Sequence, residues 1–148
     1  KLWVTSRGNY GSVRSKMFVL QKESKFSRKM VVTDTLDIPC SEMHIQGDSL
    51  YFYSVEWNNQ EERNNIAYGI IDVRTKELVT DHFITDGTEQ DIEVPYGINV
   101  HPATGDIYVT DAKNYVSSGA LHCYSREGKK KWSVRTGDIP AHMVFLNK

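Results

Sequence analysis

Three aromatic residues follow short β-rich runs at comparable positions along the chain: Tyr10, Trp57 and Tyr115. Each lies in a polar segment that also carries side-chain hydrogen-bond donors. An aromatic face can cover the apolar C–H surface of a planar or sugar-like molecule, while neighbouring donors fix its orientation. These residue types therefore predict non-covalent binding of a small molecule. The candidate ligand-binding residues are Arg7, Asn9, Tyr10, Trp57, Asn58, Lys113, Asn114, Tyr115 and His142.

A packing role is the alternative for several of these residues. Tyr10 and Tyr115 recur at one position of a repeat, as residues that cover the end of a sheet do, so both roles stay open for them. Trp57 lies in the longest and most hydrophilic of the three segments, which favours ligand binding. His142 is expected near the start of an inner strand, where a histidine serves either as a structural residue or as a ligand or general base.

Four aspartates fall at the ends of predicted strands or in the turns that follow. Asp37 and Asp138 both precede an Ile-Pro pair, which predicts that each supports the same turn through side-chain-to-backbone bonds. Asp111 ends its strand and is expected to cap the following loop in the same way. Calcium binding or catalysis is the alternative for these acids and for Asp86.

The sequence carries no recognisable catalytic signature. Residues 117–119 read Ser-Ser-Gly and lack the surroundings of a nucleophile elbow, and the histidines are scattered over different predicted strands. No CxxC pair or Cys/His spacing supports a zinc site. We therefore expect no catalytic residue, no bound metal and no cofactor.

The elements that must position the candidate residues repeat three times. Runs rich in Val, Ile, Tyr, Phe and Thr begin at Leu2, Leu50 and Ile107, a spacing close to the roughly 40–50 residues of a propeller blade. No segment shows sustained helical periodicity. Each repeat is predicted to contain up to four strands, which we name A to D. The A strands are residues 39–45, 95–100 and 140–146. The B strands open the runs 2–10, 50–58 and 107–115, each of which then breaks into a polar, aromatic-bearing loop. The C strands are 15–21, 66–73 and 120–125, and the D strands are 29–35, 78–85 and 131–136.

The predicted fold class is therefore all-β, a β-propeller portion with strand order BCD-ABCD-ABCD-A in about three antiparallel blades. Residues 1–148 are expected to form this single portion, with blades at residues 1–37, 38–93 and 94–138 and a closing strand at 139–148. Known propeller rings need roughly four to eight blades. The chain is thus expected to be part of a larger ring or to close by self-association.

Strand direction separates the connections into two sets. The B–C loops at residues 6–14, 56–65 and 112–119 emerge on the same side as the D–A connections. The A–B and C–D turns emerge on the other side and have the composition of ordinary hairpins. Function on a rigid β scaffold is usually carried by long, variable loops, so the side with the B–C loops, called here the B–C face, is the predicted binding surface.

Composition excludes some partners. The formal net charge of −1 gives no reason to expect a nucleic acid, and the basic run at residues 129–131 is read as a solvated turn. No apolar stretch approaches the roughly 20 residues of a membrane span, so no transmembrane segment is expected. Cys40 and Cys123 are predicted to be two buried thiols, with a disulfide as the alternative. The chain opens on Lys1 rather than Met, which leaves room for a leader or an upstream region.

Several segments of the chain together resemble a known family. They are Pro95-Tyr96-Gly97-Ile98, the run from Thr104 to Ala112, Gly128 to Trp132, and Thr136 to His142. They look like the C-terminal blades of YncE-like, surface-layer-type β-propellers, which Gram-negative gut anaerobes export. Many of that group are outer-membrane lipoproteins, and the group includes surface propellers that capture cobalamin and pass it to a TonB-dependent transporter. The N-terminal blades and the lipobox cysteine of such proteins are absent from this sequence.

The resemblance implies an exported, non-enzymatic protein at the extracellular face of the outer membrane or in the periplasm. It would bind cobalamin or a glycan on its B–C face, with a TonB-dependent transporter as a further partner. A protein-interaction scaffold at the cell surface is one alternative. A calcium-dependent lactonase-like hydrolase is another, because residues 95–111 also resemble such propellers, with Asn99 or Asp111 as candidate metal ligands.

Overall fold

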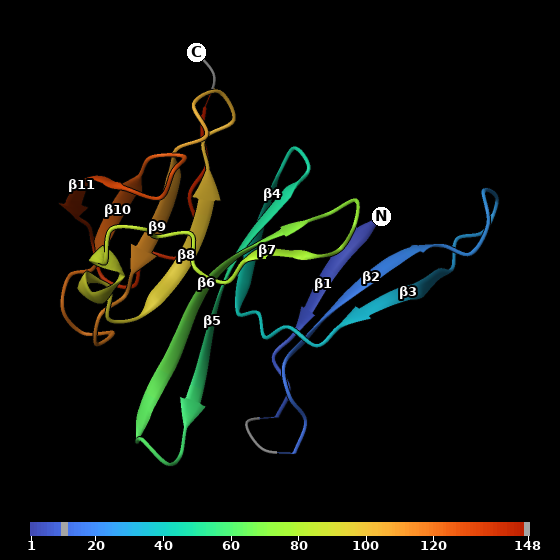
Figure 1. Ribbon diagram of the computed structural model, residues 1–148, viewed down its shortest axis with the longest axis horizontal. Helices are drawn as coiled ribbons and strands as arrows, with labels where there is room; N and C mark the ends of the chain where they lie inside the picture. The colour runs from blue at the N-terminus through green and yellow to red at the C-terminus, as the bar shows by residue number, and fades with distance from the viewer. Residues whose placement is uncertain (10–11, 147–148) are drawn as a thin grey trace. The chain divides into compact units, whose positions relative to one another are not determined.

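The computed structural model describes residues 1–9 and 12–146, and these residues form an all-β fold (Figure 1). This confirms that the chain is all-β, with antiparallel sheets. The described chain contains no α-helix, and its one helical turn is the short 3-10 helix η1 (Thr88–Asp91). The strands are β1 (Leu2–Ser6), β2 (Lys16–Lys22), β3 (Met30–Leu36), β4 (Glu42–Gln46), β5 (Ser49–Asn58), β6 (Arg63–Asp72), β7 (Leu78–Thr80), β8 (Pro95–Val100), β9 (Ile107–Asp111), β10 (Ala120–Tyr124) and β11 (Lys130–Arg135).

The strands form three antiparallel sheets, and within each sheet they follow one another in chain order. The orders are β1-β2-β3, β4-β5-β6-β7 and β8-β9-β10-β11. These sheets match the predicted groups BCD, ABCD and ABCD. Such up-and-down sheets need only short hairpin connections, because successive strands are neighbours.

The chain divides into two compact units. The first comprises Lys1–Ser41 and Ser54–Asn65, and the second comprises Glu42–Tyr53 and Ile66–Lys148. Strands β5 and β6 contribute residues to both, since the hairpin that joins them belongs to the first unit.

The first unit is built on the alternation of β2. Met17 and Val19 are fully buried, while their sequence neighbours are not, and Val19 pairs with the buried Trp3 of β1. This period-2 pattern gives the sheet one apolar face. The chain that follows β3 is tied back by the Thr5 hydroxyl, which donates to the Cys40 carbonyl at 2.5 Å. The Ser15 hydroxyl oxygen accepts a bond from the Cys40 amide at 3.1 Å.

The core of the second unit is formed by inward-facing residues of its two sheets. Ile71, Ile107 and Val109 are fully buried, as is the large ring of Tyr124. Strand β4 lies against β8, so the first strands of the two sheets are neighbours. Edge-to-face aromatic contacts extend this packing, and they include the ring pair of Tyr68 and Phe83 at 5.8 Å.

The D strand of the second sheet is shorter than predicted. It was expected over residues 78–85, but β7 ends at Thr80. The Thr80 hydroxyl oxygen accepts a bond from the His82 amide at 3.1 Å, and this local bond turns the chain out of the ladder. Beyond the turn, Phe83 and Ile84 are buried, and the Thr85 amide donates to the Gly128 carbonyl at 2.9 Å. Tertiary packing thus replaces sheet pairing here.

The predicted closing strand at residues 139–148 is wrong as a strand. Its described part, residues 139–146, joins no strand ladder and instead runs beside β8. The Asn99 side-chain amide donates to the Met143 carbonyl at 2.9 Å, and the rings of His101 and Phe145 lie 4.7 Å apart. A Cβ added at Gly97 would lie 1.8 Å from the Ala141 carbonyl oxygen, so backbone meets backbone too closely for a regular ladder.

Cys40 and Cys123 are both buried thiols, as predicted. Burial raises the pKa of the Cys123 thiol, which makes its thiolate scarce at neutral pH. Their role is therefore that of small core residues.

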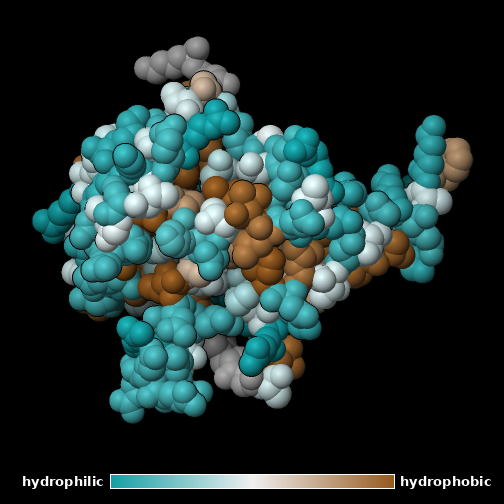
Figure 2. Space-filling model, viewed as in Figure 1, coloured by the Kyte–Doolittle hydropathy of each residue, from teal (hydrophilic) through white to brown (hydrophobic). Residues whose placement is uncertain are grey.

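The visible face of the molecule is largely hydrophilic, with hydrophobic side chains gathered in exposed patches (Figure 2). The exposed hydrophobic residues include Leu2 and Val4 of the edge strand β1 and Val79 of the edge strand β7. Within the described residues, no helical segment has both the length and the apolar character needed to cross a membrane.

Substitution of Gly97 tests how the C-terminal segment docks. Gly97→Ala would force a Cβ into the Ala141 carbonyl, so residues 139–146 should shift away from β8 and the protein should lose about 1–3 kcal/mol of stability. Urea unfolding measures the loss, and amide hydrogen exchange of residues 141–146 locates it. Gly137→Ala is the matched control, because a Cβ there meets nothing within 4 Å. Equal stability and exchange in the two variants would contradict the docking described here.

Candidate functional site

A buried carboxylate organises the B–C loop of the second unit. Asp111, at the end of β9, is 0% exposed. Its Oδ1 accepts bonds from the amides of Val94 at 2.9 Å and Lys113 at 2.8 Å, and its Oδ2 accepts one from Glu93 at 3.2 Å. The prediction that Asp111 caps the loop after its strand is confirmed. The same carboxylate also holds the chain that leads into β8.

The loop after Asp111 is closed by its own polar side chains. The Oδ1 of Asn114 accepts bonds from the Val116 amide at 3.1 Å, the Ser117 amide at 2.8 Å and the Ser117 hydroxyl at 2.9 Å. Lys113 and Tyr115 adopt left-handed backbone conformations, with φ of 48° and 64°. Such conformations persist in non-glycine residues only where the surroundings impose them, and they recur at ligand-binding sites. The loop is therefore a defined structure.

This loop presents Tyr115 to solvent. The residue is 49% exposed, and its ring forms a T-shaped pair with Tyr96 of β8, with 5.7 Å between centroids. The packing role foreseen for Tyr115 is thus present, and its ligand-binding role stays a prediction that its partial exposure permits. Its neighbour Lys113 is half-buried and forms no ion pair within the described part of the chain.

In the first unit, Arg7 and Asn9 stand in the loop between β1 and β2. One Arg7 guanidinium nitrogen donates weakly to the Ser41 carbonyl at 3.4 Å. The Asn9 side-chain Oδ1 accepts a bond from the Val13 backbone N–H at 2.9 Å, and the Asn9 backbone N–H donates to the Val13 carbonyl at 3.2 Å. Asn9 therefore shapes the loop. The predicted ligand-binding residue Tyr10 lies outside the described residues.

Trp57 and Asn58 lie on a strand rather than in a long loop. The loop predicted over residues 56–65 is wrong in its extent, because β5 continues to Asn58 and β6 begins at Arg63. Ladder pairing is favourable wherever two chains already run side by side, so the hairpin extends until its turn. Asn58 starts that turn, since its Oδ1 accepts the Gln60 amide at 2.9 Å and the Glu61 amide at 3.3 Å. Trp57 is 57% exposed.

His142 lies in the C-terminal segment rather than on an inner strand. Its Nδ1 is 3.4 Å from Glu42 Oε1 of β4, and its side chain is largely exposed. Glu42 also accepts a bond from the Tyr53 hydroxyl at 3.3 Å. His142 thus contacts β4 within the second unit, and a protonated imidazole would form an ion pair there.

The other aspartates divide into two groups. Asp86 caps a turn, as its carboxylate accepts the Thr88 hydroxyl at 2.6 Å and the Lys130 amide at 2.7 Å. These bonds hold the pKa of Asp86 below its usual value. The turn-supporting role predicted for Asp37 and Asp138 is wrong. Asp37 instead forms an exposed ion pair with Lys16 at 2.6 Å, and no side-chain bond of Asp138 is found within the described chain.

Residues 1–9 and 12–146 contain no group of three or more His, Cys, Asp and Glu side chains placed to hold a metal ion.

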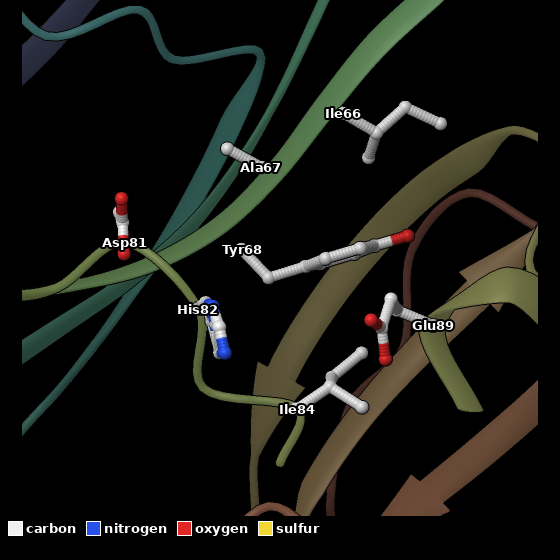
Figure 3. Close-up of a pocket in the computed structure, with 7 residues that line it drawn as sticks. All are labelled: Ile66, Ala67, Tyr68, Asp81, His82, Ile84 and Glu89. Carbon is white, nitrogen blue, oxygen red and sulfur yellow. The ribbon is translucent and has the colours of Figure 1, made fainter. Parts of the chain in front are cut away.

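A pocket in the second unit was not foreseen. It has a volume of about 260 Å³ and is lined by Ile66, Ala67, Tyr68, Asp81, His82, Ile84 and Glu89 (Figure 3). These residues come from β6, from the turn after β7 and from η1. Sequence reasoning missed them because the β7 truncation and η1 bring them together, and neither was predicted. In the sequence, only the acidic residues of the connection at residues 86–93 pointed to this region.

The sequence has no significant match among protein-family models or among curated proteins.

Replacement of Asp111 tests its organising role. Asp111→Ala leaves three backbone N–H groups without their acceptor, so the free energy of unfolding should fall by about 2–4 kcal/mol. Asp111→Asn keeps one acceptor oxygen and should lose about half as much. Urea unfolding measures both changes. Asp138→Ala removes an exposed carboxylate and should be neutral. An Asp111→Ala protein as stable as the Asp138→Ala control would show that the loop does not depend on this carboxylate.

Proposed function

We propose that this chain is part of a β-propeller that binds a small molecule through exposed aromatic side chains of its B–C loops. The exposed ring of Tyr115, held on a loop that a buried carboxylate anchors, is the observation that carries the proposal. A rigid support lowers the entropy lost when a ring engages a ligand. Trp57 of the first unit supplies a second exposed aromatic surface.

The arrangement of strands supports the propeller. Propeller blades are four-stranded antiparallel sheets whose strands follow one another in sequence, and two of the three sheets have this form. The contact between β4 and β8 joins two A strands, which are the innermost strands of neighbouring blades in such a fold. The first sheet has three strands, and its edge strand β1 exposes Leu2 and Val4. That edge is consistent with a larger ring or with self-association.

The chemistry of the loops favours a ligand with flat or apolar faces and hydrogen-bonding edges. Tyr115 and Trp57 offer exposed aromatic surface, and the side-chain NH₂ groups of Asn58 and Asn114 are further hydrogen-bond donors in the same connections. The Oδ1 atoms of both asparagines already accept bonds from the turns. Arg7 of the β1–β2 connection and Lys113 of the β9–β10 connection add positive charge. This set binds and orients a ligand, and it supplies no nucleophile paired with a base.

Cobalamin is the first ligand to test, from the resemblance to cobalamin-capturing surface propellers, and a glycan is the second. The same resemblance supports export to the cell surface, as a lipoprotein of the outer membrane or in the periplasm, with a TonB-dependent transporter as partner. A cell-surface scaffold that binds proteins through the same loops is the competing proposal.

Titration calorimetry with cobalamin and a glycan panel tests the proposal. Binding of one of these ligands should be weakened by about 1–3 kcal/mol when the aromatic anchor of the unit that binds it is removed, by Tyr115→Ala in the second unit or by Trp57→Ala in the first. The free energy of unfolding should change by less than about 0.5 kcal/mol for the exposed Trp57.

Phe26→Ala is the matched control. Phe26 is 92% exposed but lies in the C–D turn between β2 and β3, so its loss should leave binding unchanged. A Phe26→Ala effect as large as that of Tyr115→Ala would contradict a site on the B–C loops. Failure of every small ligand, together with a tight protein partner, would favour the scaffold.

A further inference from the structure

The pocket of the second unit contains two buried polar atoms that have no hydrogen-bond partner among the described residues. Tyr68 is only 5% exposed, and its hydroxyl has no hydrogen-bond partner among the described residues. Burial raises the pKa of Tyr68. Electrostatic interactions with nearby ionisable groups, Tyr124 and Asp111 among them, raise this pKa further. The hydroxyl therefore stays protonated at neutral pH. A buried hydroxyl without a partner destabilises the fold, and a ligand that bonds to it would remove that penalty.

Glu89 supplies the second unpaired atom. Its Oε2 is buried and has no hydrogen-bond partner among the described residues. Figure 3 shows that the Tyr68 ring crosses the pocket and that its hydroxyl end and the Glu89 carboxylate lie on the same side. Two polar groups, one a carboxylate, are thus available at one end of the pocket.

A second carboxylate, Asp81, also lines the pocket, on the opposite side from Glu89 and beyond the backbone end of Tyr68 (Figure 3). Between the two ends, Ile66 and Ile84 line apolar walls. The pocket therefore combines two negative ends with an apolar middle.

Among the described residues that line the pocket there is neither Lys nor Arg, and His82 is the one nitrogen-bearing side chain. The Lys130 ammonium, on the neighbouring β11, is engaged with Asp91 at 2.6 Å. A carboxylate that is partly withdrawn from water is stabilised by a positive partner with N–H donors. That partner has to come from a ligand.

We propose that this pocket binds a small aliphatic amine as its ammonium ion, and that a diamine fits it best. The ammonium donates to Glu89 Oε2 and to the Tyr68 hydroxyl oxygen, while the methylene chain contacts Ile66 and Ile84. A second ammonium at the far end meets Asp81. At about 260 Å³ the pocket is smaller than the roughly 300–1,000 Å³ of drug-sized sites, which matches a short chain. A lysine side chain shares this chemistry. The inference does not depend on the function proposed for the B–C loops.

Titration calorimetry with five matched probes tests it: 1,5-diaminopentane, pentylamine, 1-pentanol, pentanoate and N-acetyl-lysine methylamide. The two free amines should bind, the diamine more tightly, whereas pentanol and pentanoate should not. Binding of the lysine amide as tightly as pentylamine would indicate that a protein side chain is the natural occupant, and weaker binding would indicate a free amine. Both results support an ammonium site.

Three substitutions separate the contributions. Glu89→Gln keeps the shape but removes the charge, and should weaken the binding of both free amines about 10–100-fold. Tyr68→Phe should weaken it about 3–10-fold. Asp81→Asn should lower the affinity for the diamine to that for pentylamine and leave pentylamine unchanged.

Glu77→Gln is the charge control, because Glu77 is exposed and does not line the pocket. Thermal unfolding of each variant checks that the fold is intact. Equal binding of pentanol and pentylamine, amine binding that survives Glu89→Gln, or no binding of any amine to the unaltered protein would each overturn the proposal. In the last case water alone serves the two unpaired atoms.

Discussion

The second unit depends on one buried carboxylate. Asp111 gathers the amides of Glu93, Val94 and Lys113, so a single side chain joins the end of β9, the start of β8 and the following loop. A fully buried charge is tolerated only when such donors surround it. The interaction therefore has both a structural and a functional consequence. It fixes the register of two strands at one edge, and it holds Tyr115 on a loop whose backbone would otherwise adopt many conformations.

Much of the fold could be predicted because its signals are local. Alternation in β2 and the β-branched and aromatic residues of β5 and β9 mark strands in the sequence itself, and their order confirms the predicted sheets. The cap at Asp111 was predictable for the same reason. The closing strand was not, since residues 139–146 have suitable composition but pack against β8 through Asn99 and Phe145 without forming a ladder. A strand-like composition indicates a tendency to form a strand, but a strand forms only where another strand pairs with it.

The site was predicted less well than the fold. Tyr115 and Trp57 are exposed aromatics as expected, but Trp57 stands on an extended hairpin. The pocket of Tyr68 and Glu89 could not have been found from sequence, because its chemistry arises from unpaired buried atoms. Whether a polar atom is paired depends on tertiary packing rather than on residue type. The cobalamin proposal rests on resemblance, and the amine proposal rests on geometry alone.

The most direct measurement is an NMR map of the amides that shift when cobalamin or a glycan is added. The account predicts the largest changes in residues 112–118, with little change in the A–B turn at residues 101–106. Changes concentrated in that turn, with residues 112–118 unmoved, would contradict a binding site on the loop that Asp111 anchors.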